Sequence, residues 1–496
     1  MIVTRFPPSP TGFVHVGSLR TALYSYLFAR KNKGKFLIRI EDTDQKRYVE
    51  GAVENLLSTL KWAGLEYDEG PEVGGPHAPY YQSQRTELYK KNVQDLLKNG
   101  TAYYCFCTSE RLDEMRQGQE RRKEAPMYDR HCTKFSEKEI EEKIKSEVPY
   151  VIRQKIPQEK ILILNDLIRG KVRFDGRVID DQVLMKSDGF PTYHLANVID
   201  DHDMEITHVI RGEEWLSSTP KHIWLYEAFG WTPPQFAHIP LLLNADRSKL
   251  SKRQGDVAVE DYIKKGYSKE AIINFIALLG WHPGKGIEKE IYSLPELVEA
   301  FSLEGVHKAG AIFDIQKLDW FNWQWTRRKI EEKLEKIGNT LENRAKLLLE
   351  LCEEYLEKDW LKDKNLLARA LKTVEEKITQ NPKEVRVYLQ FYFQEPEIKK
   401  ELICSEKMKV DTEIAKKVSA AAGKKLETIS PENFTEEEIK KSLIEVVTEL
   451  GLKNGQIFWP VRAGLTGEQF SPGVFEVIWA LGKEKTLERL KKLEQI

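Results

Sequence analysis

One stretch near the start of the chain, residues 5–18, limits the fold more than any other. It is rich in Pro, Ser and Gly, and it lies between two segments of different periodicity. Residues 2–6 are mostly β-branched or aromatic, which is typical of a strand, whereas apolar residues recur at helical spacing from about Ser18 onward. A second strand is predicted over residues 35–40. The pattern therefore predicts a β-α-β unit whose first turn lies at the ligand-binding edge of a parallel sheet.

The residues of this turn suit an anion. Gly17 lets a ligand approach the backbone closely, and free N–H groups at the start of the helix favour a phosphate. His15 lies just before the helix and can donate a hydrogen bond to a phosphoryl oxygen. A His-x-Gly pair alone is more often an ordinary loop with a surface histidine. The phosphate interpretation therefore depends on a second half of the site.

A cationic segment around Lys249 and Lys252 supplies that second half. It follows an apolar run, residues 238–243, that we interpret as a buried strand, and Ser251 and Gly255 lie beside it. Two lysines three residues apart suit the polyphosphate of ATP during attack on its α-phosphorus, where negative charge must be neutralised. A lysine run alone is usually a solvated surface. Together, the two segments favour a nucleotide site.

Both segments resemble the paired signatures of the class I aminoacyl-tRNA synthetases. Residues 15–18 stand where that family has HIGH, and residues 249–253 stand where it has KMSKS. The resemblance narrows to glutamyl-tRNA synthetase through residues 5–12, 39–44, 188–197 and 209–215. It is close from residue 1 to about 325, and beyond that it depends on length, helicity and order. Pro7 departs from the family, which commonly has a small residue there, and offers no backbone N–H.

The resemblance implies a reaction in two steps. Glutamate attacks the α-phosphorus of Mg-ATP to give glutamyl-adenylate and pyrophosphate, and the terminal ribose of tRNA(Glu) then takes the glutamyl group. Bound tRNA is expected to be needed before glutamate is activated. No covalent nucleophile is required, because positioning and charge stabilisation suffice. The expected ATP-binding residues are Ser9, His15, Gly17, Ser18, Lys249, Ser251 and Lys252, and the expected catalytic ones among them are His15, Gly17, Lys249 and Lys252.

The amino-acid substrate has two carboxylates and one ammonium, so it needs cationic groups and one anion. Arg5 and Arg211 offer planar forks suited to carboxylates, and Glu41 offers the anion. Taken singly, each is more often a surface salt-bridge partner. Because their surroundings match the family's glutamate pocket, we predict a glutamate-binding set of Arg5, Ser9, Glu41, Tyr193, Asn197 and Arg211.

The expected fold is α/β: a split Rossmann-type catalytic domain with an α/β insertion, followed by an all-α C-terminal region. At about 150 residues per domain, a chain of 496 residues should hold three or more domains. The expected ranges are 1–100 and 196–255 for the catalytic halves, 101–195 for a connective insertion that guides the tRNA acceptor end, 256–325 for a junction domain that contacts the stem, and 326–496 for a helical anticodon-binding region.

Three cysteines in the expected insertion could bind zinc. Cys105 and Cys107 are one residue apart and Cys132 follows later, so they can supply three tetrahedral corners, with Tyr128 or His131 as the fourth. Some relatives of the family use a Cys-x-Cys, Tyr, Cys set, which this spacing matches. The alternative is three reduced structural thiols. The cofactor predictions are therefore Mg²⁺ with ATP, and Zn²⁺ as a second candidate.

Composition limits location and partners. No run of about 18 apolar residues exists, the N-terminus begins directly in a predicted strand, and five cysteines in a long chain favour a reducing compartment. We therefore expect a cytoplasmic protein with no membrane span and no signal peptide. We also expect a monomer. The net charge of −1 gives no global attraction to nucleic acid, so tRNA would need local basic patches.

Three other functions share some of these features. A glutaminyl-tRNA synthetase has the same catalytic motifs, but its anticodon region is a β-barrel, whereas residues 326–496 have helical periodicity. The shorter enzyme that glutamylates a modified tRNA base lacks an anticodon region, so the chain length argues against it. A catalytically dead paralogue that only binds tRNA is disfavoured because His15, Gly17, Lys249 and Lys252 are intact.

Overall fold

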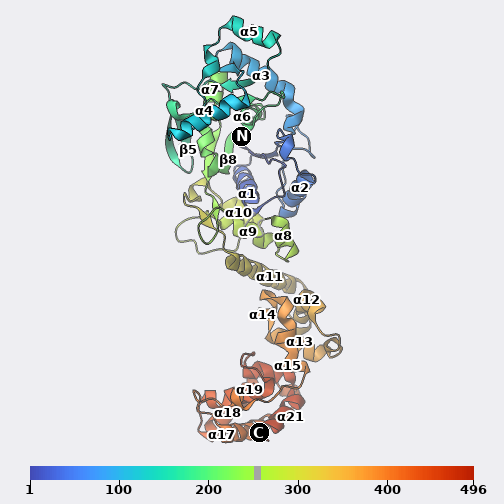
Figure 1. The fold of residues 1–496 in the computed structure, drawn as a ribbon. Helices are drawn as coiled ribbons and strands as arrows, with labels where there is room; N and C mark the ends of the chain where they lie inside the picture. The colour runs from blue at the N-terminus through green and yellow to red at the C-terminus, as the bar shows by residue number, and fades with distance from the viewer. Residues whose placement is uncertain (251–257, 496) are drawn as a thin grey trace. The chain divides into compact units, whose positions relative to one another are not determined.

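The computed structural model describes residues 1–250 and 258–495. It divides into two units, Met1–Phe321 and Asn322–Ile496, which are described separately. The first unit mixes helices with strands, and the second is built from helices, drawn orange to red in Figure 1. This confirms the predicted fold class.

A six-stranded sheet, in the order β2-β1-β8-β9-β5-β6, forms the centre of the first unit. The neighbours from β2 to β5 run parallel, and β6 at one edge is antiparallel to β5. The strands are β1 Val3–Phe6, β2 Lys35–Ile38, β5 Ile161–Asp166, β6 Gly170–Asp175, β8 His208–Gly212 and β9 Gln235–Ile239. Since β5 and β6 lie within residues 101–195, the segment expected to be an insertion also extends the catalytic sheet.

The rest of that segment forms a smaller layer. Strands β3 Ala102–Cys105, β4 Val151–Gln154 and β7 Val183–Met185 make an antiparallel sheet, accompanied by helices α4 Ser109–Arg121 and α5 Glu137–Lys145. Helix α5 begins with a capping box, in which the Ser136 hydroxyl accepts from the Glu139 N–H and the Glu139 carboxylate accepts from the Ser136 N–H. The mixture of strands and helices agrees with the α/β insertion of the expected fold.

Helix α1, Val16–Lys31, begins two residues before the predicted start at Ser18. The reason is a side-chain cap, since His15 Nδ1 accepts a hydrogen bond from the Ser18 N–H at 3.1 Å. The apolar run 238–243 is not one strand, because Pro240 has no N–H and separates β9 from β10. The other elements of this unit are α2 Ala52–Ala63, α3 Thr86–Lys98, α6 Tyr193–Asp203, α7 Thr219–Phe229, β10 Leu242–Leu243, α8 Val259–Lys264, α9 Lys269–Leu278, α10 Leu294–Ala300 and β11 Ala311–Ile312.

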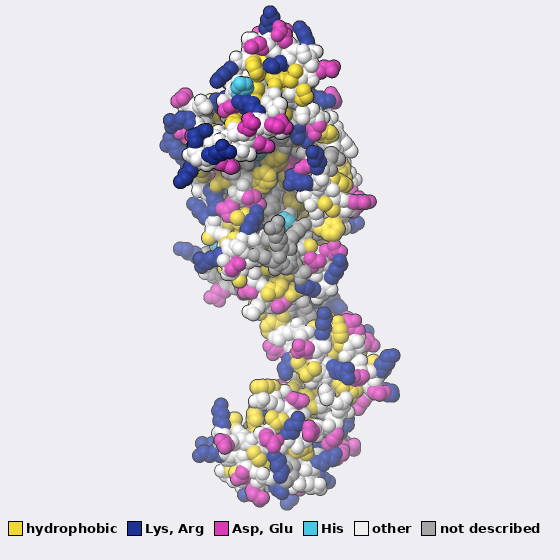
Figure 2. Space-filling model, in the orientation of Figure 1, with side chains coloured by type: hydrophobic (Ala, Val, Ile, Leu, Met, Phe, Trp, Pro, Cys, Tyr) yellow, Lys and Arg dark blue, Asp and Glu magenta, His cyan; other side chains and the backbone are white. Residues whose placement is uncertain are grey.

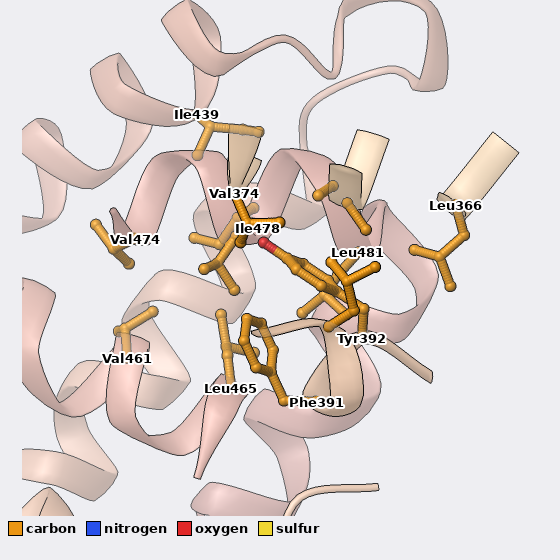
Figure 3. Packing of buried hydrophobic residues seen from close by; sticks show 14 of the residues in the cluster. Leu366, Val374, Phe391, Tyr392, Ile439, Val461, Leu465, Val474, Ile478 and Leu481 are labelled. Carbon is orange, nitrogen blue, oxygen red and sulfur yellow. The ribbon is translucent and has the colours of Figure 1, made fainter. Parts of the chain in front are cut away.

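The second unit packs its helices around an apolar core of its own. Figure 3 shows part of this core, where the Tyr392 ring lies among Val374, Ile478 and Leu481. Helix α12 ends at Cys352, so the helical periodicity of this region does not continue as one long helix. The helices are α11 Ile315–Ile337, which begins before Asn322, α12 Leu341–Cys352, α13 Lys364–Thr373, α14 Glu375–Gln380, α15 Val385–Phe393, α16 Lys400–Ile403, α17 Thr412–Glu427, α18 Glu436–Leu450, α19 Asn454–Thr466, α20 Val474–Leu481 and α21 Lys483–Leu493.

Candidate active site

A cavity of about 1020 Å³ lies at the carboxyl ends of β1 and β8 in the first unit. This is the edge at which parallel sheets of this type bind ligands. The predicted site residues that line it are Arg5, Ser9, His15, Gly17, Ser18, Glu41, Tyr193, Arg211 and Lys249. Asn197 does not line it, but it is buried and its amide donates to Glu41 Oε1 at 3.4 Å. Ser251, Lys252 and Gly255 lie outside the described residues.

The start of helix α1 forms one wall. Because His15 Nδ1 accepts from the Ser18 N–H, its Nε2 carries the proton, and that atom lies 2.8 Å from Ser18 Oγ. A Cβ atom on residue 17 would lie 3.0 Å from His15 Nδ1, so glycine also makes room for the imidazole. The arrangement presents an N–H group and a hydroxyl beside the amino end of a helix, which suits a phosphate.

Lys249 belongs to the second of the two sequence motifs, and it also lines the cavity. Its backbone is held against β10 by a bridge to Leu243, and the next residue, Leu250, donates to the Leu242 carbonyl at 2.9 Å. The Lys249 ammonium lies 4.0 Å from Glu214 Oε1 and is 58% exposed. An ion pair this long and exposed contributes little, so the ammonium can turn to a phosphate at small cost.

Arg5 and Glu41 belong to a buried network of charges. Arg5 Nε lies 3.2 Å from Asp201 Oδ1, while Arg39 pairs with Asp201 at 2.8 Å and with Glu41 at 3.0 Å. Burial acts to raise the pKa of Asp201, but the attraction of Arg5 and Arg39 outweighs it and keeps the pKa below its usual value. The Asp201 carboxylate is therefore charged, and it fixes Arg5 through its Nε side. Within the described chain, the buried Arg5 Nη1 has no hydrogen-bond partner.

Arg211 has a different environment, because its hydrogen-bond partners among the described residues are neutral acceptors. They are Tyr193 Oη at 3.2 Å, His222 Nδ1 at 3.3 Å, Thr219 Oγ1 at 2.8 Å and His238 Nε2 at 3.1 Å. No carboxylate among residues 1–250 and 258–495 pairs with it, and burial lowers the pKa of its guanidinium. The charge of Arg211 is thus held in place without being neutralised, which suits an anionic ligand.

The sequence reasoning missed the charges that support this pocket. Asp200 accepts hydrogen bonds from Gln82, Arg85 and Tyr89, and Asp201 holds both Arg5 and Arg39. The signal was present as two adjacent acids that follow the largely apolar residues 195–199 on one helix, and as an arginine inside an apolar strand. A charge in such a position must be paired when the segment is buried.

The three cysteines predicted as metal ligands lie together away from the cavity. The sulfurs of Cys105, Cys107 and Cys132 are all within 4.8 Å of one another, and the Cys107 and Cys132 sulfurs are 3.5 Å apart. Tyr128 Oη lies 3.3 Å from Cys107 Sγ. His131 is exposed, and its ring packs edge-on against Phe135. Three thiols around one point can supply three corners of a tetrahedral zinc site, with the Tyr128 phenol beside them.

Comparison with known proteins defines the class. Residues 1–320 match the family model described as "tRNA synthetases class I (E and Q), catalytic domain", and residues 347–493 match "Anticodon binding domain".

The relatives narrow that class. The chain is 49% identical over 496 residues to "Glutamate--tRNA ligase" of Chlorobaculum parvum, covering 99% of this chain and 97% of the relative. It is 46% identical over 489 residues to "Glutamate--tRNA ligase" of Clostridium botulinum, covering 98% and 97%. A crystal structure of a glutamate tRNA ligase from Elizabethkingia meningosepticum in complex with its amino acid superposes with a TM-score of 0.79 at 37% identity, covering 100% and 99%. The chain belongs to the glutamate–tRNA ligase family.

Proposed function

We propose that the chain attaches L-glutamate to tRNA(Glu) through a glutamyl-adenylate, releasing AMP and pyrophosphate, for use in protein synthesis. The single observation that carries this proposal is the meeting of two sites in one cavity. The phosphate-binding start of α1 lies in the same cavity as Arg5, Glu41 and Arg211, which match a dicarboxylic amino acid. The helical second unit, with no strand among residues 322–495, favours this function over a glutaminyl-tRNA synthetase with a β-barrel anticodon region.

The glutamate carboxylates would divide between the two arginines. The α-carboxylate becomes a neutral mixed anhydride when the adenylate forms, whereas the side-chain carboxylate stays charged through both steps. A buried, unneutralised cation is best matched to the permanent anion, so we assign Arg211 to the side-chain carboxylate. Arg5, whose Nη1 has no hydrogen-bond partner among the described residues, would contact the α-carboxylate. Glu41, with Asn197 and Tyr193 beside it, would hold the ammonium.

The nucleotide would lie along the start of α1. His15, Gly17, Ser18 and Ser9 would contact the phosphates, and Lys249 would neutralise charge that develops on the transferring phosphoryl group. Mg²⁺ arrives with ATP as part of the substrate. Ser251 and Lys252 are proposed to complete this side on the strength of the sequence motif, since they lie outside the described residues.

We assign Cys105, Cys107, Tyr128 and Cys132 as zinc ligands. The phenol of Tyr128 lies against the sulfurs, whereas the exposed His131 ring faces Phe135, so the contacts favour Tyr128 as the fourth ligand. Zinc bound there would tie β3 to the segment that precedes α5 and would have a structural role. The proposed role of the surrounding layer is to guide the tRNA acceptor end, and residues 256–325 are proposed to contact the stem.

The second unit is proposed to read the anticodon. Its match to an anticodon-binding domain supports this, as do aromatic and cationic side chains close together, such as Arg462 over the Trp459 ring at 5.0 Å and the 79% exposed Phe470. On the face drawn in Figure 2, Lys and Arg side chains are interspersed with Asp and Glu. Attraction to RNA phosphates would therefore come from local contacts.

We further propose a monomer that works in the cytoplasm, with five free thiols in support of a reducing compartment. Among the described residues, no helix is both long and apolar enough to cross a membrane.

Separate charging of purified tRNA(Glu) and tRNA(Gln) with labelled glutamate tests the function. Charging of tRNA(Glu) is the expected result, and charging of tRNA(Gln) as well would extend the substrate range to a misacylated intermediate. Absence of glutamate charging on either tRNA, by protein that binds ATP, would overturn the proposal.

A further inference from the structure

We infer that Asp166 and His238 position Arg211 for the side-chain carboxylate of glutamate, by holding an imidazole as a neutral acceptor against the guanidinium. Neither Asp166 nor His238 lines the cavity, so both would act through Arg211 as positioning residues. The inference rests on the role proposed above for Arg211.

Three neighbouring strands bring these side chains together. Arg211 on β8 is the register partner of His238 on β9, and Asp166 ends the adjacent strand β5. Asp166 Oδ2 lies 2.6 Å from His238 Nδ1, and His238 Nε2 lies 3.1 Å from Arg211 Nε. The side chains of Asp166 and His238 are 0% exposed. The result is a continuous buried row of carboxylate, imidazole and guanidinium.

The partners fix the tautomer of the imidazole. A guanidinium can only donate, so His238 Nε2 must accept, and the ring proton must lie on Nδ1, where it is donated to Asp166. Thr219 Oγ1 also lies 3.1 Å from Nε2 and can donate to the same nitrogen. Asp166 is itself held by the backbone N–H groups of Ile168 at 3.0 Å and Arg169 at 2.7 Å. The backbone after β5 thus fixes the Asp166 carboxylate, which orients the His238 ring, and the ring in turn orients the Nε side of Arg211.

The imidazole separates the negative charge from the cation that it orients. Arg5 is paired directly with the Asp201 carboxylate, whereas the hydrogen-bond acceptors of Arg211 among the described residues are hydroxyls and imidazole nitrogens. A carboxylate in the place of His238 would neutralise Arg211 and would compete with the substrate. With neutral partners, the guanidinium keeps both its direction and its charge for an incoming anion. The same arrangement penalises the amide of glutamine, which would leave the charge unpaired.

Matched substitutions test the roles of the two imidazole nitrogens, Nδ1 and Nε2, separately. In His238→Gln the amide oxygen can lie near the former Nε2 and keep an acceptor for Arg211, whereas His238→Asn mimics the Nδ1 side and loses that acceptor. In Asp166→Asn the backbone N–H groups hold the amide oxygen, which turns the NH₂ group toward Nδ1. The ring would then carry its proton on Nε2, facing Arg211.

The assay is tRNA-dependent pyrophosphate exchange by full-length protein, with glutamate and ATP varied separately and with Arg211→Gln as reference. We expect His238→Asn and Asp166→Asn to raise the glutamate KM at least about tenfold, the weight of one hydrogen bond to a charged group, with the ATP KM within about twofold. His238→Gln should lie closer to wild type. Unchanged glutamate KM in His238→Asn and Asp166→Asn, or equal damage in both His238 variants, would overturn the inference. If Arg211→Gln itself leaves glutamate use unchanged, the pocket assignment fails instead, and the positioning role fails with it.

The tautomer of His238 can also be measured in the wild-type protein, so this second test does not depend on whether a variant folds. Long-range ¹H–¹⁵N correlation of ¹⁵N-histidine-labelled protein distinguishes the two neutral tautomers of a ring. The inference requires His238 to be neutral and protonated at Nδ1. A proton on Nε2, or a doubly protonated ring at neutral pH, would refute it.

Discussion

Arg211 and Arg39 are both buried arginines of the first unit, and we expect their replacement by glutamine to have opposite consequences. Arg39 is surrounded by carboxylates, with Asp201 at 2.8 Å, Glu41 at 3.0 Å and Asp200 at 3.6 Å. Arg211 is surrounded by neutral acceptors. Arg39→Gln should therefore destabilise the fold, whereas Arg211→Gln should impair glutamate use and leave the fold intact.

The magnitudes follow from what each substitution leaves behind. Arg39→Gln leaves buried carboxylates without their partner, which costs about 3–5 kcal/mol of unfolding free energy. Arg211→Gln leaves no unpaired anion and removes a buried charge, so we expect a change within about 1 kcal/mol. Losing two charge-assisted hydrogen bonds to a carboxylate, at about 1.5–3 kcal/mol each, corresponds to a loss of roughly 10²–10⁴ in kcat/KM for glutamate.

Two assays separate these effects. Urea-dependent hydrogen exchange of peptides from residues 1–321 gives the stability of the first unit apart from the second. Pyrophosphate exchange with glutamate and ATP varied in turn gives the kinetic loss, which should fall on glutamate in Arg211→Gln. Equal destabilisation by the two substitutions, or an unchanged kcat/KM for glutamate in Arg211→Gln, would refute the reasoning.

Four further outcomes are expected. Metal analysis should find about one zinc per chain, lost in Cys105→Ser and kept in Cys352→Ser, and a fully active metal-free preparation would contradict the site. Lys252→Ala should slow adenylate formation by roughly 10²–10³ without unfolding, and near-wild-type exchange would remove Lys252 from catalysis. A truncated chain ending at Gly338 should lose discrimination against anticodon-substituted tRNA in charging assays, and unchanged discrimination would exclude an anticodon-reading role. Burial, with Lys221 and Arg211 nearby, lowers the pKa of His194 to about 3 from its usual 6.5. Between these two pH values, the His194 ring is therefore protonated in the unfolded chain and neutral in the folded chain. Stability should thus be complete above pH 6.5 and lower by about 2 kcal/mol at pH 5, and urea unfolding of His194→Gln should show a weaker pH dependence.

Local patterns were enough to predict individual elements in both units. The Pro- and Gly-rich turn between a strand and a helix carries its own signal, as does the helix over residues 436–450. The start of α1 was displaced by two residues because a side chain, His15, supplies the cap, and a histidine is not a usual cap residue.

The supporting residues of the pocket could not be predicted, because strand register decides them. His238 becomes the partner of Arg211 only when β8 and β9 align, and Asp166 reaches His238 from a strand that looks like part of an insertion. In the sequence, each of these residues is one polar side chain within or at the end of a largely apolar segment. The adjacent acids Asp200 and Asp201 likewise acquire their roles through arginines from distant segments.

The most direct test of the central claim is pyrophosphate exchange in the presence of Mg-ATP and tRNA(Glu), with glutamate and glutamine offered separately. The pocket built around an unneutralised Arg211 predicts exchange that depends on glutamate and on tRNA, with glutamine at least about a hundredfold less effective. Equal exchange with glutamine, or none with glutamate, would contradict the account of how this chain selects and activates its amino acid.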